Sequence, residues 1–292
     1  MIDSKSLAAL SAILRHGSFE AAAHELSVTP SAISQRIKSL EDRLGTVLLQ
    51  RGTPATATET GQRLVQHAEE IGLLEASLAK DLGLPDANAP YIKIATNADS
   101  LATWLMPALA ECEGMLIELI VDDQDHSADW LRRGEVQAAI TSHNTAIQGS
   151  DCTPLGNLRY IASCSGAYQE RWFSDGINEH SLKVAPALLF NRKDRLQRDW
   201  VRQKVGHALA LRSHQIPSSE GFVEAALLGL GWGMNPEILI GDHLKSGSLV
   251  ALDPKLPLDV PLYWQANRRV SHALAPLTKA IHAAAKRALL AP

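Results

Sequence analysis

Four polar side chains lie at helical spacing in the segment 29–44. Thr29 is a favourable N-cap residue and Pro30 is favourable at the first helical position, so we expect a helix to begin here. One face of this helix is apolar and must pack inward, and it holds Ile33, Ile37, Leu40 and Leu44. The opposite face carries hydroxyls, an amide and a cation, in Ser31, Ser34, Gln35 and Lys38. Such side chains can hydrogen-bond to base edges and phosphates in the major groove of DNA, but a solvated helix face would have the same composition.

A second group of polar residues follows segments that we expect to be strands. Strands are predicted for residues 91–96, 116–121 and 136–141, because each segment is short and rich in apolar or β-branched residues. The polar residues at or just after the strand ends are Asn97, Asp99, Ser100, Thr103, Asp122, Asp123 and Thr141. Ligands of α/β proteins bind at the carboxyl ends of strands, so these residues are candidates for a binding site.

These residues offer two kinds of binding chemistry. The N–H groups at the start of the helix after Asn97, with the hydroxyls of Ser100 and Thr103, can hold a carboxylate. The acids of residues 122–125, and Glu220 from later in the chain, can hold an ammonium or guanidinium group. Structural roles are equally open, because first-turn acids also complement helix dipoles and acids before a helix can cap it.

The first 84 residues are predicted to be mainly helical. Apolar periodicity and its interruptions predict helices at 7–14, 18–26, 30–44 and 59–82, with a short β wing within 46–58. Two helices, a tight turn and a capped third helix form a helix-turn-helix, whose second helix enters the groove of DNA. Basic side chains concentrate in the third helix and the wing, so Arg36 and Arg51 are further candidate DNA contacts.

Residues 83–90 contain a glycine and two prolines and form the clearest linker in the chain. Beyond them, short apolar runs alternate with helical stretches, which is typical of an open α/β sheet with helices on its faces. Further strands are predicted at 160–164, 187–190 and 260–264, and helices at 99–110, 127–133, 220–228 and 272–290. The overall fold class is therefore α/β, preceded by an all-α unit.

Composition narrows the class of protein. The chain has 292 residues, which favours two domains, and its net charge of −4 excludes a generally basic nucleic-acid coat. We find no signal peptide, no membrane span and no catalytic motif, and the three cysteines are too far apart for a disulfide framework. These features predict a cytoplasmic protein that is not an enzyme and needs no metal or cofactor.

Several motifs together resemble the N-terminal motif of LysR-type transcriptional regulators. They are Phe19–Ala23, Thr29–Ile37, Leu40-Glu41, Leu44-Gly45 and Thr58–Gly61, in the family's order over about sixty residues. The resemblance implies a winged helix-turn-helix in residues 1–60 and a dimerising linker helix and hinge in residues 61–90. It also implies an effector domain of two α/β lobes in residues 91–292, similar to a periplasmic binding protein.

The second half of the chain is similar to the LysG/ArgP subgroup of that family. The similar segments are Asn97–Trp104, Asp122–Ser127, Arg133–Glu135, Glu220–Phe222, Gly229–Met234 and Leu262–Trp264. The subgroup senses lysine or arginine and controls an amino-acid exporter gene; a different small-molecule effector is the alternative. The resemblance implies operator DNA, RNA polymerase and further copies of the chain, as a homodimer or homotetramer, as partners. Where the wing of the subgroup often has an arginine, this chain has Pro54–Ala57, which puts one DNA contact in doubt.

Overall fold

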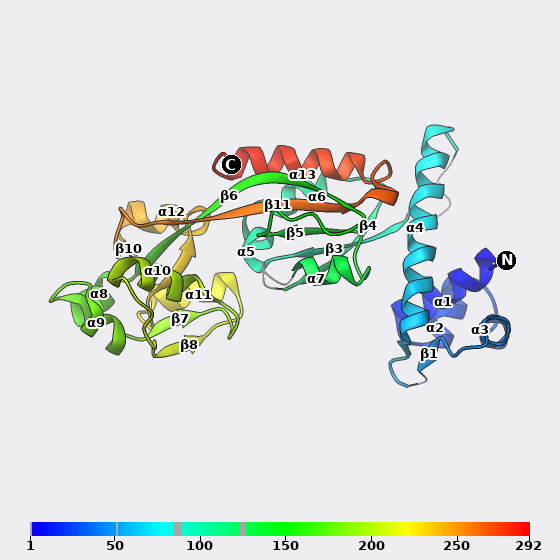
Figure 1. The fold of residues 1–292 in the computed structure, drawn as a ribbon, viewed down its shortest axis with the longest axis horizontal. Coiled ribbons are helices and arrows are strands. Elements are labelled where there is room, and N and C mark those ends of the chain that lie inside the picture. Colours follow the sequence, from blue (N-terminus) through cyan, green and yellow to red (C-terminus); the bar gives the residue numbers. More distant parts are fainter. Residues whose placement is uncertain (1, 51, 85–88, 123–126) are drawn as a thin grey trace.

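The computed structural model describes residues 2–50, 52–84, 89–122 and 127–292. The N-terminal helices lie at one end of an elongated molecule (Figure 1). One long helix, α4, stands between them and the C-terminal half of the chain, which forms two lobes arranged in line. This is the mixed arrangement of a helical unit and an α/β unit that the sequence predicts.

The N-terminal unit contains the three predicted helices, and side chains cap each of them. Asp3, Ser18 and Thr29 accept backbone N–H bonds at the three helix starts, and glycines in left-handed conformation end the first and third helices. The helices are α1 (Ser4–His16), α2 (Phe19–Glu25) and α3 (Pro30–Leu44). The wing is an antiparallel pair of two-residue strands, β1 (Leu49–Gln50) and β2 (Thr56–Ala57).

Helix α4 (Glu59–Asp81) begins at the Thr58 cap and ends close to its predicted bounds. It packs on both halves of the molecule, because Val65 joins the core of the N-terminal unit and Leu73 joins the core of the C-terminal half. A stripe formed by Leu74 and Leu78 of this helix and by Leu82, its C-cap, stays exposed in the single chain, at 45%, 58% and 64%.

The first lobe, lobe I, contains the predicted βαβ units. Its parallel strands lie in the order β4-β3-β5, and they are β3 (Tyr91–Thr96), β4 (Leu116–Val121) and β5 (Ala138–Thr141). Helix α13 covers one side of this sheet and α7 the other (Figure 1). The helices of lobe I are α5 (Ala98–Ser100), the π turn η1 (Leu101–Leu105), α6 (Met106–Ala110), α7 (Ser127–Arg132), the 3-10 turn η2 (Arg268–Val270) and α13 (Ala275–Ala288).

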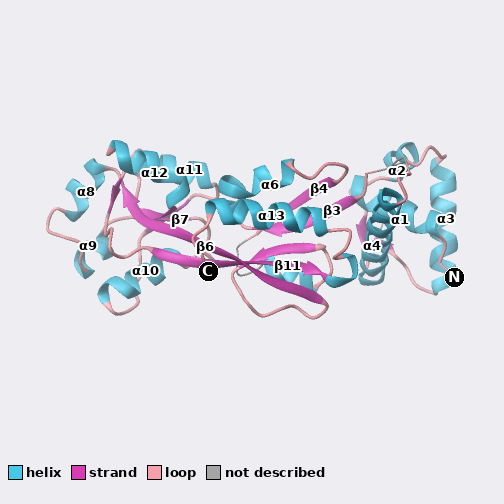
Figure 2. Ribbon diagram, turned by 90° about the horizontal axis from the view of Figure 1, so that it is seen from above, coloured by secondary structure: helices cyan, strands magenta, loops and turns pink. Residues whose placement is uncertain are grey.

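Two long strands, β6 (Ser150–Cys164) and β11 (Leu258–Asn267), run antiparallel through both lobes (Figures 1 and 2). The expected strands at 160–164 and 260–264 are therefore too short, and both runs extend much further. The extension was missed because polar residues and a proline interrupt the apolar pattern, while pairing between the strands keeps them extended. β11 pairs β5 antiparallel, whereas β3 pairs both β4 and β5 in parallel, so the sheet is mixed.

The second lobe, lobe II, is built between these two long strands. Its strands are β7 (Ala187–Leu189), β8 (Ser213–Gln215), β9 (Gly233–Pro236) and β10 (Val250–Ala251). Its helices are α8 (Gly166–Phe173), α9 (Glu179–Val184), α10 (Leu196–Val205), α11 (Ser219–Leu227) and α12 (Glu237–Ser246). Only α11 among these helices was predicted, because the other four are short or rich in charged residues.

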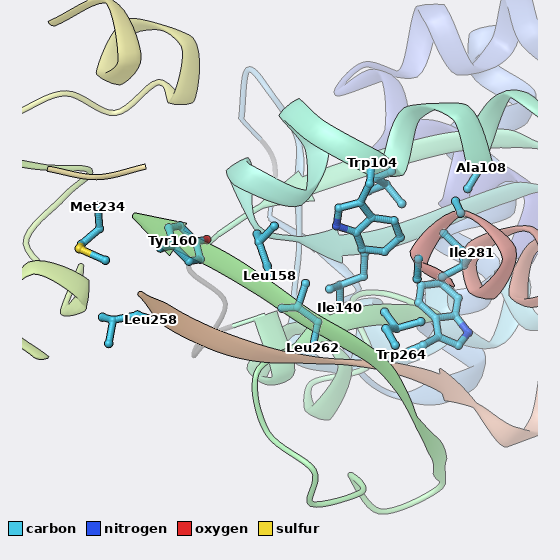
Figure 3. Close-up of a cluster of buried hydrophobic side chains, with 14 of the residues drawn as sticks. Trp104, Ala108, Ile140, Leu158, Tyr160, Met234, Leu258, Leu262, Trp264 and Ile281 are labelled. Atoms are coloured by element: carbon cyan, nitrogen blue, oxygen red, sulfur yellow. The ribbon is translucent and has the colours of Figure 1, made fainter. Parts of the chain in front are cut away.

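A single core joins the two lobes along β6. Figure 3 shows Trp104, Ile140 and Trp264 packed together in lobe I, and Tyr160 on β6 between them and Met234 of lobe II. Trp104 and Trp264 are both 2% exposed, so these indoles belong to the core. The two lobes therefore meet across a packed pair of crossover strands.

Candidate functional site

Helix α3 presents a polar face to solvent. The Thr29 hydroxyl accepts the backbone N–H of Ala32 at 3.2 Å, and Pro30 occupies the first turn. The exposed residues are Ser31, Ser34, Gln35 and Lys38, and Arg36 is half-buried. Ile33, Ile37 and Leu40 are buried as expected, whereas the expectation for Leu44 is wrong, since it is 38% exposed in the last turn of the helix. Arg51 lies outside the described residues.

The wing is fixed relative to α3 by hydrogen bonds. The Glu41 carboxylate, on α3, accepts the backbone N–H of Leu48 at 2.7 Å. At the far end of the wing, the Ala55 N–H donates to the carbonyl of Gly17 at 2.9 Å. A capped helix with a wing fixed beside it is an arrangement that can enter one groove of DNA and contact the phosphates beside that groove.

The second candidate site is a cavity of about 210 Å³ between the lobes. Lobe I contributes Asn97, Asp99, Asp122 and Ser142, and the long strand β6 contributes Tyr160. Lobe II contributes Asp194, Arg195, Asp199, Ser219 and Asn235. Because both lobes line the cavity, a ligand bound there would contact both of them and favour one relative position of the lobes.

Asp99 joins the two lobes inside this cavity. Its Oδ1 accepts the hydroxyl of Ser219 in lobe II at 2.7 Å, and its Oδ2 accepts the hydroxyl of Tyr160 at 2.7 Å. The residue before the helix, Asn97, is 5% exposed, and its side chain accepts the N–H of Ser100 at 2.6 Å. The cap fixes the start of α5 and thereby the position of the Asp99 carboxylate.

Asp122 makes a second connection between the lobes. Its backbone N–H donates to the Thr96 carbonyl at 3.0 Å, which holds the end of β4 beside the end of β3. Its Oδ2 accepts the indole N–H of Trp130 at 3.0 Å, and its Oδ1 lies 3.2 Å from the ammonium of Lys193 in lobe II. The carboxylate is therefore fixed in place by lobe I and paired with a cation from lobe II.

Lobe II brings two further carboxylates to the cavity. Asp194 is 7% exposed, and its two oxygens accept the N–H groups of Phe190 at 2.8 Å and Leu196 at 3.0 Å. Asp199 lies in the first turn of α10. Among the described residues, the lining thus holds four aspartates, two from each lobe, and one cation, Arg195, while the Lys193 ammonium pairs with Asp122 from outside the lining. Such a lining attracts a ligand that carries positive charge.

Of the eight residues predicted for an effector site, three line this cavity: Asn97, Asp99 and Asp122. Glu220 is exposed on the outside of α11, where its carboxylate lies 3.5 Å from the Ser218 hydroxyl. Asp123 lies outside the described residues.

The other three predicted residues are buried or hydrogen-bonded within lobe I. Ser100 is fully buried below the cavity lining. Thr103 donates its hydroxyl to the Asp99 carbonyl at 2.6 Å, within its own helix. Thr141 is fully buried and accepts the side-chain amide of Gln265 at 3.1 Å. None of the three is among the described residues that line the cavity.

Sequence reasoning missed the lobe II half of this site. Residues 192–199 carry so many charges that they resemble a solvated surface segment. One signal was available, because Asn191 and Asp194 closely follow the short strand β7. The lobe I residues were predicted from the same pattern, in which Asn and Asp come after a strand. Tyr160 gave no signal, because within a strand a tyrosine is expected to pack in the core.

Asn235, on β9, is the other lining residue that the sequence did not single out. It is fully buried, and its side-chain amide donates to the hydroxyl of Ser163 at 3.0 Å. Its Oδ1 has no hydrogen-bond partner within the part of the chain that the structure describes. A buried acceptor of this kind is expected to be satisfied by a donor, which a ligand in the cavity can supply.

Cysteine thiols, metal-binding clusters and membrane-spanning helices are further features on which a function could rest. Burial raises the pKa of the Cys164 thiol to about 12 and also raises the pKa values of Cys112 and Cys152, which keeps the thiols protonated. Over the described ranges, no group of three or more His, Cys, Asp or Glu is arranged to hold a metal ion. No described helix combines the length and the apolar content that a membrane span needs.

Two family matches cover most of the chain. Residues 4–62 match the bacterial regulatory helix-turn-helix proteins of the lysR family, and residues 86–286 match the LysR substrate binding domain. The chain therefore belongs to the LysR family of transcriptional regulators. The family resemblance predicted from the N-terminal motifs is confirmed.

Individual relatives narrow the group. LysG of Mycobacterium tuberculosis is 42% identical over 285 residues, which is 97% of this chain and 94% of the relative. The crystal structure of ArgP from Mycobacterium tuberculosis has 41% identity and a TM-score of 0.83, covering 100% of both chains. Full-length LysG of Corynebacterium glutamicum with bound effector Arg has 37% identity and a TM-score of 0.70, covering 99% of both chains. The predicted similarity to LysG and ArgP regulators is confirmed.

Proposed function

We propose that this regulator senses a basic amino acid, lysine or arginine, in the cavity between its lobes and controls a gene for amino-acid export. The observation that carries the proposal is the charge of the cavity lining, in which the described residues include four aspartates from two lobes and one arginine, an excess of negative charge even with Lys193 paired to Asp122. The relatives add support, because the Corynebacterium glutamicum protein is described as a lysine export regulator and was solved with arginine.

The cavity has complementary groups for each end of such a ligand. Asp99 and Asp122 offer carboxylate oxygens to an ammonium or a guanidinium group, and charge-assisted hydrogen bonds of this kind are strong. Asn235 offers a buried amide oxygen to a further N–H of the ligand. Arg195, the cation of the lining, suits the α-carboxylate.

The proposed DNA contacts are on α3 and the wing. Gln35 and the serines of the exposed face suit base edges, whereas Lys38, Arg36 and Arg51 suit phosphates. We propose three functional regions: residues 1–60 bind operator DNA, residues 61–90 form the dimerisation helix and hinge, and residues 91–292 bind the effector. The matched ranges 4–62 and 86–286 support this division.

The proposed partners follow from this role. The exposed leucine stripe of α4 supports pairing with a second copy, in a homodimer or in a homotetramer built from dimers. The ligand would shift a population of quaternary states and thereby the bend or spacing of the bound operator, which changes how RNA polymerase engages the promoter. A regulator that reads the chromosome acts in the cytoplasm, and nothing in this role requires a catalytic step.

A titration against the twenty amino acids tests the proposal. Isothermal calorimetry should detect binding of arginine or lysine, and either ligand should raise the melting temperature, since a ligand at one hundred times its Kd adds about 2.7 kcal/mol of stability. Asp122→Asn should weaken this binding about ten- to a hundredfold, because it removes a charge-assisted hydrogen bond. Asp151→Asn, which removes an exposed acid of lobe I outside the cavity, should bind as the wild type does.

Two outcomes would contradict the proposal. Stabilisation by a neutral or acidic amino acid alone would mean that the aspartates of the cavity are structural and that the effector is of another class. Equal weakening by Asp122→Asn and Asp151→Asn would mean that the cation does not bind at the end of β4.

A further inference from the structure

Lys193 places a primary ammonium against Asp122, which lines the cavity proposed for a basic amino acid. Its Nζ lies 3.2 Å from Asp122 Oδ1, and the two side chains are 50% and 25% exposed. Lys193 belongs to the turn between β7 and α10 in lobe II, and Asp122 directly follows β4 in lobe I. The ion pair therefore joins the two lobes at Asp122, a residue of the cavity lining to which the positive charge of a ligand is expected to bind.

The turn that carries Lys193 is held by its own hydrogen bonds. The Asn191 side chain accepts the backbone N–H of Lys193 at 2.7 Å and that of Asp194 at 3.1 Å. Asp194 in turn accepts the N–H groups of Phe190 and Leu196, on either side of the turn. Since both ends and the centre of the turn are bonded, the direction in which Lys193 leaves the backbone is fixed.

Asp122 is equally fixed on the other side. The indole of Trp130 donates to Oδ2, so the carboxylate cannot rotate freely and Oδ1 faces lobe II. A ligand cation that binds Asp122 at Oδ1 needs the position that the Lys193 ammonium now occupies. The two cations carry the same charge, and a lysine ligand would offer the same chemical group.

We propose that Lys193 is an internal competitor of the effector, whose ammonium holds Asp122 until a basic amino acid displaces it. The proposal rests on the function proposed above and concerns the regulation of the same cavity. It means that the lobes are joined by one cation in the absence of effector and by another in its presence. The apparent affinity is then the intrinsic affinity reduced by the fraction of molecules in which Lys193 has left Asp122.

Removing the competitor should tighten binding of the effector. If Lys193 holds Asp122 in about nine of ten molecules, the apparent Kd of the wild type is about tenfold above the intrinsic value. Lys193→Met, which keeps an apolar stem without the ammonium, should therefore lower the Kd for arginine and for lysine by about three- to tenfold in calorimetry. Lys193→Gln, a polar replacement, should do the same.

Arg192→Met is the matched control, because it removes the exposed cation next in the chain, whereas the ion pair with Asp122 is made by Lys193. Lys193→Met and Arg192→Met each remove one positive charge, so a general electrostatic effect would appear in both variants. We expect the Kd of Arg192→Met to stay within about twofold of the wild type, at one ionic strength and with melting curves that show a folded chain.

Other results would overturn either the competition or the proposed function. An unchanged Kd in both Lys193 variants, with normal binding by the wild type, would overturn the competition and leave the proposed function intact. Weaker binding in both would overturn it as well, and would show that Lys193 holds the ligand, for instance by its carboxylate. If neither the wild type nor any variant binds a basic amino acid, the proposed function fails, and the competition fails with it.

Discussion

Gln35 lies in the middle of the exposed face of α3, and Lys38 lies one turn further along the same helix. An amide can form two hydrogen bonds to the edge of one base, which is worth about 1–3 kcal/mol of discrimination, whereas an ammonium binds phosphates without regard to sequence. We therefore predict that Gln35→Ala reduces the preference for the operator over unrelated DNA about ten- to a hundredfold. Fluorescence anisotropy with both DNAs measures this ratio.

Lys38→Ala is the variant with which Gln35→Ala should be compared. It should weaken binding to both DNAs alike and lower the salt dependence by about one phosphate contact, with the ratio unchanged. Because both side chains are exposed, neither substitution should alter the melting temperature by more than a degree or two. An unchanged preference in Gln35→Ala would remove Gln35 from the set of base-reading residues.

At the scale of elements, helix α4 carries an apolar surface that a single chain leaves exposed. Leu74, Leu78 and Leu82 recur every four residues along one side of this helix, and all three are exposed. We predict that Leu78→Asp raises the dissociation constant of the proposed dimer at least a hundredfold, since a carboxylate would be buried in its interface without a partner. Sedimentation equilibrium at micromolar concentration should then show the mass of a single chain. Leu228→Asp, at an exposed leucine of lobe II, should still sediment at least as a dimer.

How far the sequence predicts each element depends on where the information for that element lies. Capping and apolar spacing are local, so α1, α3 and α4 agree with their predicted bounds within a few residues. The length of β6 is not local, because its pairing partner β11 lies about a hundred residues away. For the same reason, only half of the cavity lining could be predicted. Its lobe I residues follow strands that can be recognised from the local sequence, whereas its lobe II residues are brought to the cavity by the pairing of the crossover strands.

At the scale of the whole molecule, Glu69 of α4 contacts the starts of two strands that lead to the cavity. Its carboxylate lies 2.8 Å from the Lys93 ammonium on β3 and accepts the side-chain amide of Gln137 at 2.9 Å. β3 leads from Lys93 to Asn97, and β5 follows Gln137 and leads to Ser142, so each strand connects the linker helix to the lining of the cavity. We propose that a movement of lobe I on ligand binding is transmitted to α4 through these hydrogen-bonded strands.

This connection predicts that Glu69→Gln separates effector binding from the DNA response. The variant keeps the shape of the side chain but leaves Lys93, whose side chain is 22% exposed, without its ion-pair partner. Coupling between sites typically changes affinity by about 5- to 150-fold, and we expect the arginine-dependent change in operator affinity to fall at least threefold, while the Kd for arginine stays within about twofold. Glu75→Gln, at an exposed acid of the same helix, should keep the full response. An equal response in both variants would mean that the signal reaches the DNA-binding unit by another route, such as the stacking of Arg15 on the Tyr91 ring at 4.0 Å.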